Sequence, residues 1–365
     1  MQMTKVSFME KLKVEKHPDV VTMHDFFLDH FVTYTGERSS VEPFIKQLKR
    51  LARLGGGHVT GEIKQQILRG GKGFNSSSAL SSLGAKVHFI GRTSPLGLYL
   101  MKFFLEGKKV DLSHVKTDGD MGITTTIEMK YQGRMFNTMV SHLGSVSNFD
   151  FEDLTAKDLN TIRKTDYLLL TQWSLNSRGT DFADKLLNFA AKHSCIKFFD
   201  PGDPGVRPKD IPDLVERVLV KPSFDVLGVN ESEAIYFASY FYPEYLKKKG
   251  GIETIGIKCA SILAEKLKKR VDLHTPRFSA TFHEDKEIIV PTYKVDVLRV
   301  TGAGDSWQAG NAYGELIGLE EYERLMFANA VAAYYISNPA GKHATLQEIT
   351  RFVKARSLRR LLVHS

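Results

Sequence analysis

Short apolar segments alternate with amphipathic helical segments through the middle of the chain, and this alternation limits the fold more than any other feature of the sequence. Strands are predicted at residues 86–90, 167–171, 196–200 and 224–229, with helical periodicity between them. Strands that are apolar throughout and separated by helices are typical of a parallel sheet covered on both faces. The sequence therefore predicts an α/β fold, doubly wound, with a mostly parallel sheet.

Polar strand-like segments are left over from this sheet, and we expect them to form a small β lid. The lid strands are predicted near residues 25–35, 57–68 and 123–140. A helix predicted at 41–54 is an insertion between lid strands, and a run of three glycines at 55–57 ends it. Residues 1–18 are interpreted as an N-terminal extension, so that 19–365 form one domain. A lid strand can also pair edge to edge with a second copy, which makes a homodimer one option.

The composition argues against several classes of function. The net charge is +8, but the positive residues are dispersed, which argues against nucleic-acid binding as the main role. No apolar run reaches membrane-spanning length, and the N-terminus lacks the apolar core of a signal peptide. Cys195 and Cys259 form neither a disulfide framework nor a metal spacing, as suits a reducing compartment. We therefore expect a cytoplasmic protein with no nucleic-acid or membrane partner.

The sequence TGAGDS at 301–306 joins an extended segment to a predicted helix. Glycines at such a turn let backbone N–H groups converge on an anion, and the helix N-terminus adds a favourable partial charge. A carboxylate would repel a bound phosphate, so Asp305 is better suited to act as a base beside the phosphate than as its ligand. Alternatively, Asp305 only caps the helix, because Asp is a preferred N-cap residue.

A second glycine-rich turn, GGKGFN at 70–75, opens another predicted helix. Its paired glycines permit a close approach of the backbone to a ligand. Lys72 and Asn75 offer donors for hydroxyl groups. The alternative is a flexible turn in which Asn75 is the helix N-cap.

Asn230 and Glu233 follow directly after the predicted strand at 224–229. Ligands of open α/β sheets bind at the C-terminal ends of the strands. Two polar side chains one helical turn apart at such a position could hold hydrated Mg²⁺ and phosphate oxygens. The alternative is a capping box of the Asn-x-x-Glu form.

The order and wide separation of these three motifs resemble the ribokinase (PfkB) family of carbohydrate kinases, from about residue 19 to 354. GGKGFNSSSALSSLG at 70–84 looks like the N-terminal signature of the family, and VTGAGDSWQA at 300–309 looks like its C-terminal signature. Residues 230–234 look like its Asn-x-x-Glu motif, and FANAVAA at 327–333 resembles its helix beside adenine. The resemblance implies a ribokinase-like fold with a β lid.

The resemblance also implies an ATP-dependent kinase that transfers the γ-phosphate to a hydroxyl of a sugar, sugar acid, polyol or nucleoside, with Mg²⁺ as cofactor. Asp305 would be the catalytic base, and the amides of Gly302, Ala303 and Gly304 would form the anion hole. Glu233 would hold Mg²⁺ through water. Binding roles are implied for Asp29, Gly71, Lys72 and Asn75 toward the substrate, and for Asn230, Glu233, Thr301 and Asn329 toward the nucleotide.

The chain departs from the family pattern at two informative positions. The family usually has Asp at the position of Arg299, in a segment that often helps to bind a monovalent cation, so K⁺ activation is doubtful. The loop LHTPRFS at 273–279 stands where a Thr-Leu-Gly nucleotide loop is expected. Two alternatives therefore stay open: an ADP-dependent sugar kinase of the same architecture, and a binding or regulatory protein that has kept the fold and lost catalysis.

Overall fold

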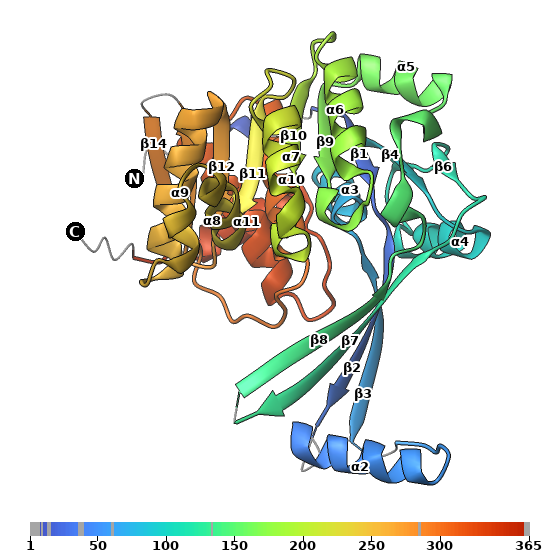
Figure 1. Cartoon of the computed structure of the whole chain (residues 1–365). Coiled ribbons are helices and arrows are strands. Elements are labelled where there is room, and N and C mark those ends of the chain that lie inside the picture. The colour runs from blue at the N-terminus through green and yellow to red at the C-terminus, as the bar shows by residue number, and fades with distance from the viewer. Residues whose placement is uncertain are drawn as a thin grey trace.

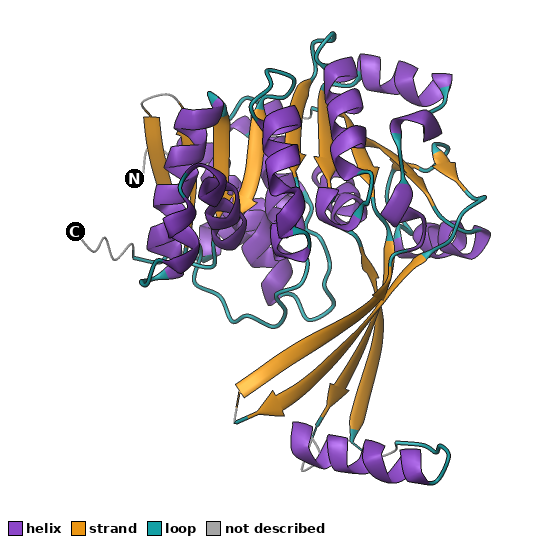
Figure 2. Ribbon diagram, in the orientation of Figure 1, coloured by secondary structure: helices purple, strands orange, loops and turns teal. Residues whose placement is uncertain are grey.

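A large sheet with helices on both faces forms the body of the molecule, as Figures 1 and 2 show. The computed structural model describes Phe8 and residues 10–12, 16–35, 40–59, 62–132, 134–283 and 286–360. In these residues the sheet order is β14-β13-β12-β11-β10-β9-β1-β4-β5, with β6 beside β4. The strands are β1 (Asp19–His24), β4 (Lys86–Arg92), β5 (Val110–Asp111), β6 (Val115–Lys116), β9 (Tyr167–Thr171), β10 (Ile196–Asp200), β11 (Val226–Asn230), β12 (Arg270–His274), β13 (Phe278–His283) and β14 (Lys286–Pro291).

Neighbouring strands from β5 to β12 pair in parallel, and β12, β13 and β14 pair antiparallel at one edge. The predicted doubly wound, mostly parallel sheet is therefore confirmed. The helices are α3 (Lys72–Leu83), α4 (Pro95–Phe104), α5 (Ala156–Lys164), α6 (Gly179–Ala190), α7 (Ile211–Leu214), α8 (Glu231–Phe241), α9 (Ile252–Leu267), α10 (Ala303–Leu316), α11 (Glu321–Ser337) and α12 (Leu346–Ala355).

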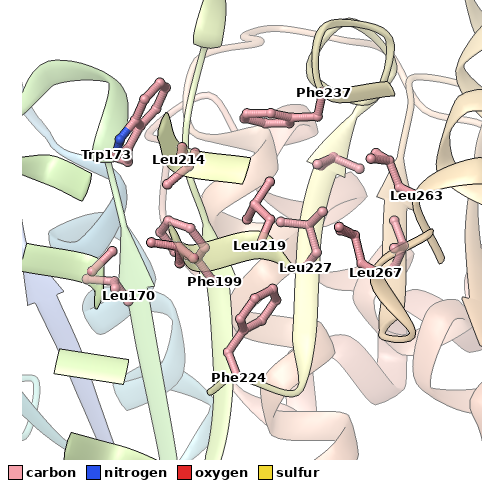
Figure 3. Close-up of a cluster of buried hydrophobic side chains, with 14 of the residues drawn as sticks. Leu170, Trp173, Phe199, Leu214, Leu219, Phe224, Leu227, Phe237, Leu263 and Leu267 are labelled. Atoms are coloured by element: carbon pink, nitrogen blue, oxygen red, sulfur yellow. The ribbon is translucent and has the colours of Figure 1, made fainter. Parts of the chain in front are cut away.

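Strand residues point alternately into two hydrophobic clusters, one on each face of the sheet. In β9, Leu168 and Leu170 belong to one cluster, and Tyr167 and Leu169 belong to the other. Figure 3 shows the first cluster, in which side chains of β9, β10 and β11 pack against those of α7, α8 and α9. Burial on both faces is the reason why these strands are apolar throughout.

A four-stranded sheet, in the order β3-β2-β7-β8, projects from the body and carries α2 (Val41–Arg53) at its far end (Figure 1). The first strand of the large sheet ends at His24, so the chain crosses to the small sheet at Asp25. One strand begins later than predicted, at Ile63 rather than near residue 57, and Gly57 itself has a positive φ of 152° that strand residues do not adopt. The strands are β2 (Phe27–Tyr34), β3 (Ile63–Gly70), β7 (Gly122–Tyr131) and β8 (Arg134–His142).

Part of the N-terminal extension packs against the body, although most of it lies outside the described residues. Phe8 is fully buried, and its ring centroid lies 5.9 Å from that of Phe327 on α11. Nζ of Lys11 lies 2.8 Å from a carboxylate oxygen of Glu323 on the same helix. Among the helices in the described ranges, none is both long enough and apolar enough to span a bilayer.

Candidate active site

Charged side chains gather at the C-terminal edge of the large sheet. Asp25 follows β1, Asp200 ends β10, and Glu233 lies in the first turn of α8, directly after β11. Lys72 and Asp305 join them from the first turns of α3 and α10. The four carboxylates are almost completely buried. This is the edge at which open α/β sheets bind ligands.

Asp305 is held by a hydrogen bond from a distant part of the sequence. Nδ2 of Asn75 donates to Oδ2 of Asp305 at 2.8 Å. The N-cap of α10 is Gly302, with a φ of 84°, so the alternative in which Asp305 serves only as the cap is wrong. A Cβ atom at Gly302 would lie 2.7 Å from the hydroxyl oxygen of Tyr335, which explains the glycine at this turn.

Lys72 lies between two buried carboxylates. Its Nζ is 3.0 and 2.8 Å from the two oxygens of Asp200 and 3.8 Å from Oε1 of Glu233. Asp25 fixes the turn, because its carboxylate accepts the backbone N–H groups of Lys72 and Gly73 at 2.6 and 2.9 Å. The GGKG segment is therefore a tightly held turn rather than a flexible one.

Two glycines in this turn are required by close contacts with the two acids that follow β1. A Cβ atom at Gly70 would lie 2.3 Å from the carboxylate of Asp29. Gly71 has a φ of 93°, and a Cβ atom there would lie 2.4 Å from the carbonyl oxygen of Asp25. The paired glycines thus let the backbone approach both aspartates.

Asn230 and Glu233 form the reciprocal capping box that the sequence left open as an alternative. The N–H of Asn230 donates to Oε2 of Glu233 at 2.8 Å, and the N–H of Glu233 donates to Oδ1 of Asn230 at 2.9 Å. The box uses one carboxylate oxygen of Glu233 and leaves Oε1 facing Lys72. The cap therefore fixes a side chain that still presents an oxygen to the site.

Burial controls the protonation of these groups. It raises the pKa of Asp305 to about 7, although Lys72 and the hydrogen bond from Asn75 oppose the shift. It also raises the pKa of Glu233 to about 7 against the effect of Lys72. For Lys72 burial favours a lower pKa, but Asp200 and Glu233 together hold its pKa above the usual value. A carboxyl group that titrates near neutral pH is suited to accept a proton from a substrate.

Two cavities meet at the segment that precedes α10. Val297 and Val300 line both of them, Ala303 and Gly304 line the first, and Thr301 lines the second. The first measures about 480 Å³ and its lining, largely apolar, includes Asn230, His274, Tyr293, Trp307, Ala332 and Ile336. The second measures about 550 Å³, and most of the residues that line it are polar, among them Asp29, Lys64, Arg69, Asn75, Glu128 and Asn137.

The predicted binding residues divide unevenly between these cavities. Asp29 and Asn75 line the polar cavity, and Thr301 lines the polar cavity rather than the apolar one. Asn329 lines the apolar cavity, but its side chain is engaged within the protein. Its Oδ1 accepts the Trp307 indole N–H at 3.0 Å, and its Nδ2 donates to two main-chain carbonyls. Asn329 is therefore better placed to shape the cavity than to bind a ligand through its amide.

Sequence analysis missed Asp25, Asp200 and His274 as members of the site. Asp200 ends an apolar strand, as Asn230 does, and this position at the C-terminal edge of the sheet was the available signal. His274 ends β12 and stacks on Trp307 with ring centroids 5.0 Å apart. Burial lowers the pKa of His274 to about 4, so its ring is neutral at physiological pH.

Residues 61–347 match the model of the pfkB family of carbohydrate kinases. The chain belongs to the PfkB family. A 5-dehydro-2-deoxygluconokinase from Geobacillus thermodenitrificans is 22% identical over 295 residues, which are 78% of this chain and 84% of that protein. Family membership confirms the expectation of a phosphotransferase of the carbohydrate kinase type.

Solved structures of ribokinases resemble this PfkB protein over almost its whole length. A ribokinase from Arabidopsis thaliana, complexed with ribose and ATP, has a TM-score of 0.68 and 19% identity, over 93% of this chain and 99% of that one. A ribokinase from Cryptococcus neoformans, in complex with ADP, has a TM-score of 0.67 and 18% identity, over 92% and 99% of the two chains. These likenesses confirm the ribokinase-like fold.

The acidic residues of the site fit a magnesium ion held through water. Mg²⁺ takes oxygen ligands and usually keeps several of its waters. Burial disfavours the charged form of the Glu233 carboxylate and raises its pKa, and a nearby cation would stabilise that charge. Nζ of Lys72 already contacts both carboxylate oxygens of Asp200. Oε1 of Glu233 is therefore the oxygen best placed to reach a hydrated ion.

Proposed function

We propose that this PfkB kinase transfers the γ-phosphate of ATP to a hydroxyl group of a sugar-like acceptor, with Asp305 as the general base. The observation that carries the proposal is the position of Asp305, a buried carboxyl with a pKa of about 7. It follows Thr301, which lines the polar cavity, and Ala303 and Gly304, which line the apolar cavity. Its hydrogen-bond partner Asn75 also lines the polar cavity. This arrangement supports a nucleotide in the apolar cavity and a hydroxyl-rich acceptor in the polar cavity.

Asp305 accepts the proton of the acceptor hydroxyl as the hydroxyl oxygen attacks the γ-phosphorus. The new P–O bond forms while the bond to the β-phosphate oxygen breaks, and ADP leaves. The backbone N–H groups of Gly302 and Gly304 stabilise the charge on the transferred phosphoryl group. The N–H of Ala303, implied by the family resemblance as a third donor, already donates to the carbonyl oxygen of Val300 at 3.1 Å. Lys72 supplies a fixed positive charge beside the phosphates, and bound Mg²⁺ supplies further neutralisation of phosphate charge.

The polar cavity favours acceptors that carry a negative charge as well as hydroxyl groups. Three basic side chains, Lys64, Arg69 and Arg299, line it against two acidic ones, Asp29 and Glu128. Burial, together with the nearby charge of Asp25, raises the pKa of Asp29 to about 7. The carboxyl group of Asp29 can therefore donate a hydrogen bond to a hydroxyl group of the acceptor or accept one from it. We infer that sugar acids bind more tightly than neutral sugars, polyols and nucleosides.

A phosphate-transfer screen tests the proposal. The purified protein is incubated with Mg²⁺ and either ATP or ADP, over a panel of sugars, sugar acids, polyols and nucleosides. We expect turnover with ATP and the highest kcat/KM for a sugar acid. Turnover with ADP alone would indicate an ADP-dependent kinase. Acceptors that raise the melting temperature without any phosphate transfer would contradict catalysis and indicate a binding protein.

The pKa of Asp305 predicts the acid side of the pH–rate profile. The base must be ionised to accept a proton, so kcat/KM is expected to rise with pH up to about 7, and to fall about tenfold per unit well below it. Glu233 also has a pKa of about 7, so the profile is measured for wild type and Glu233→Gln. The acid limb is expected to persist in that variant, although the overall rate falls. An acid limb that disappears with Glu233 would contradict the assignment of the base to Asp305.

The position of Arg299 predicts that K⁺ has little effect. Its guanidinium donates to the carbonyl oxygen of Pro339 at 2.6 Å and lies against Gly341, so a fixed cation already occupies this loop. Replacing K⁺ by Na⁺ or choline should change kcat by less than about twofold, because the charge at the loop is unchanged. Arg299→Asp installs the residue usual in the family and is expected to create K⁺ activation. Strong K⁺ activation of the wild type would contradict this account.

A further inference from the structure

Two histidines and an aspartate converge at the edge of the large sheet that β4, β5 and β6 form. Figure 1 shows β4 and β6 at this edge, near α4 and α5. His88 comes from β4, Asp111 ends β5, and His114 precedes β6. Oδ2 of Asp111 lies 3.1 Å from Nδ1 of His88 and 3.6 Å from Nε2 of His114. One nitrogen or oxygen atom from each of the three side chains lies within 4.8 Å of the others.

A second layer of acceptors and donors orients all three side chains. Oδ1 of Asp19 lies 2.9 Å from Nε2 of His88, and Oδ1 of Asp158 lies 2.6 Å from Nδ1 of His114. The N–H of Ser113 donates to Oδ1 of Asp111 at 2.8 Å. Each imidazole thus has its outer nitrogen against a carboxylate, which requires a proton on that nitrogen. This is the arrangement in which metal-bound histidines are usually held.

The inner nitrogens of both imidazoles face the same oxygen of Asp111. Nδ1 of His88 makes a hydrogen bond with this oxygen at 3.1 Å, and Nε2 of His114 lies 3.6 Å from it. The Thr161 hydroxyl, 3.4 Å from Nε2 of His114, is at the long end of hydrogen-bond distances. A cation between the three side chains would replace these contacts with bonds to the ion.

We propose that His88, His114 and Asp111 bind a zinc ion at this edge of the sheet. Zinc accepts imidazole nitrogen and carboxylate oxygen, whereas magnesium takes oxygen alone. Bonds of about 2.0–2.2 Å in a tetrahedron hold the ligand atoms about 3.3–3.5 Å apart. The distances of 3.1 and 3.6 Å bracket that spacing. Asp111, whose side chain is 39% exposed, leaves the fourth position open to water.

The zinc site is separate from the phosphotransfer site and has a structural role. Asp19 begins β1, and Asp25 follows the end of the same strand. Six residues of extended strand separate the two sites by about 20 Å. The ion joins three short segments at the sheet edge, so its loss is expected to lower stability more than catalysis.

Zinc binding to the full-length protein tests the inference. The protein is stripped with a chelator, dialysed and titrated with ZnCl₂ in a calorimeter. We expect one zinc per chain, a higher melting temperature with zinc, and the visible absorption of tetrahedral Co²⁺ when cobalt replaces zinc. Asp19→Asn, which changes an outer partner, is expected to weaken zinc binding about 10–100-fold.

Asp111→Ala is expected to abolish zinc binding, and the exposure of this side chain favours a folded variant. The matched control is Asp118→Ala, which removes an exposed acid that pairs with Arg92 outside the cluster. The absence of stoichiometric binding would overturn the inference, and so would unchanged binding in Asp111→Ala and His88→Gln. In either case the cluster would be held together by its hydrogen bonds alone.

Discussion

Asp305→Asn is expected to lower kcat by about 10²–10⁴-fold and to leave the Kd for ATP nearly unchanged. The variant keeps the size of the side chain and an oxygen that can accept the hydrogen bond from Asn75, but it cannot take up the acceptor proton. Steady-state kinetics give kcat, and nucleotide titration in the absence of acceptor gives Kd. A rate within tenfold of wild type would rule out Asp305 as the base.

A stability measurement separates lost catalysis from lost folding. The pKa of Asp305 is about 7 in the folded protein and about 3.9 in an unfolded chain. The folded state therefore binds this proton more tightly, and the contribution of Asp305 to stability falls as the pH rises from about 4 to about 7. Asp305→Asn removes the cost of burying an ionised carboxylate. At pH 8 its melting temperature is therefore expected to equal or exceed that of wild type. A lower melting temperature would mean that the activity was lost through folding.

Lys72→Met is expected to lower the free energy of unfolding by about 3–5 kcal/mol, because it leaves buried carboxylates without their cation. Both carboxylate oxygens of Asp200 accept hydrogen bonds from Lys72, and Asp200 is fully buried. In the variant the negative charge of Asp200 is therefore neither compensated by Lys72 nor hydrated by water. Denaturant unfolding at neutral pH gives the free energy. Activity is expected to fall as well, since Lys72 lies beside the proposed phosphate site.

Two variants control for this effect. Lys72→Met combined with Asp200→Asn removes both charges and is expected to recover part of the lost stability, as a coupled pair does. Lys185→Met breaks an exposed ion pair with Glu152 and is expected to leave the free energy of unfolding almost unchanged. Equal losses in Lys72→Met and Lys185→Met would show that the buried charges are compensated in another way.

Patterns that depend on local sequence predicted the fold and the centre of the site. Strands buried on both faces must be apolar, so the alternation of segments identified the parallel sheet. Gly70, Gly71, Gly302 and Gly304 identified the two turns, because a Cβ atom at each would make a close contact and Gly71 and Gly302 also have positive φ angles. Asp305, Lys72 and Asn75 follow these turns directly, and the structure brings all three together.

Residues that reach the site through the tertiary structure alone could not be predicted in the same way. Asp25 looks like part of a continuous polar strand, and only the crossing of the chain between two sheets turns its carboxylate onto the GGKG turn. Thr301 lies one residue from the turn, but the backbone directs it to the polar cavity. His88 and His114 are 26 positions apart, so their spacing in the sequence does not indicate a metal site. Pairing of β4 with β5 brings them together in the folded protein.

A crystal structure with a non-hydrolysable ATP analogue, Mg²⁺ and the preferred acceptor tests the central claim most directly. The account predicts an acceptor hydroxyl about 2.6–3.2 Å from the carboxylate of Asp305. It also predicts the γ-phosphate against the amides of Gly302 and Gly304, with the base of the nucleotide in the apolar cavity. An acceptor bound away from Asp305, or a nucleotide in the polar cavity, would contradict it.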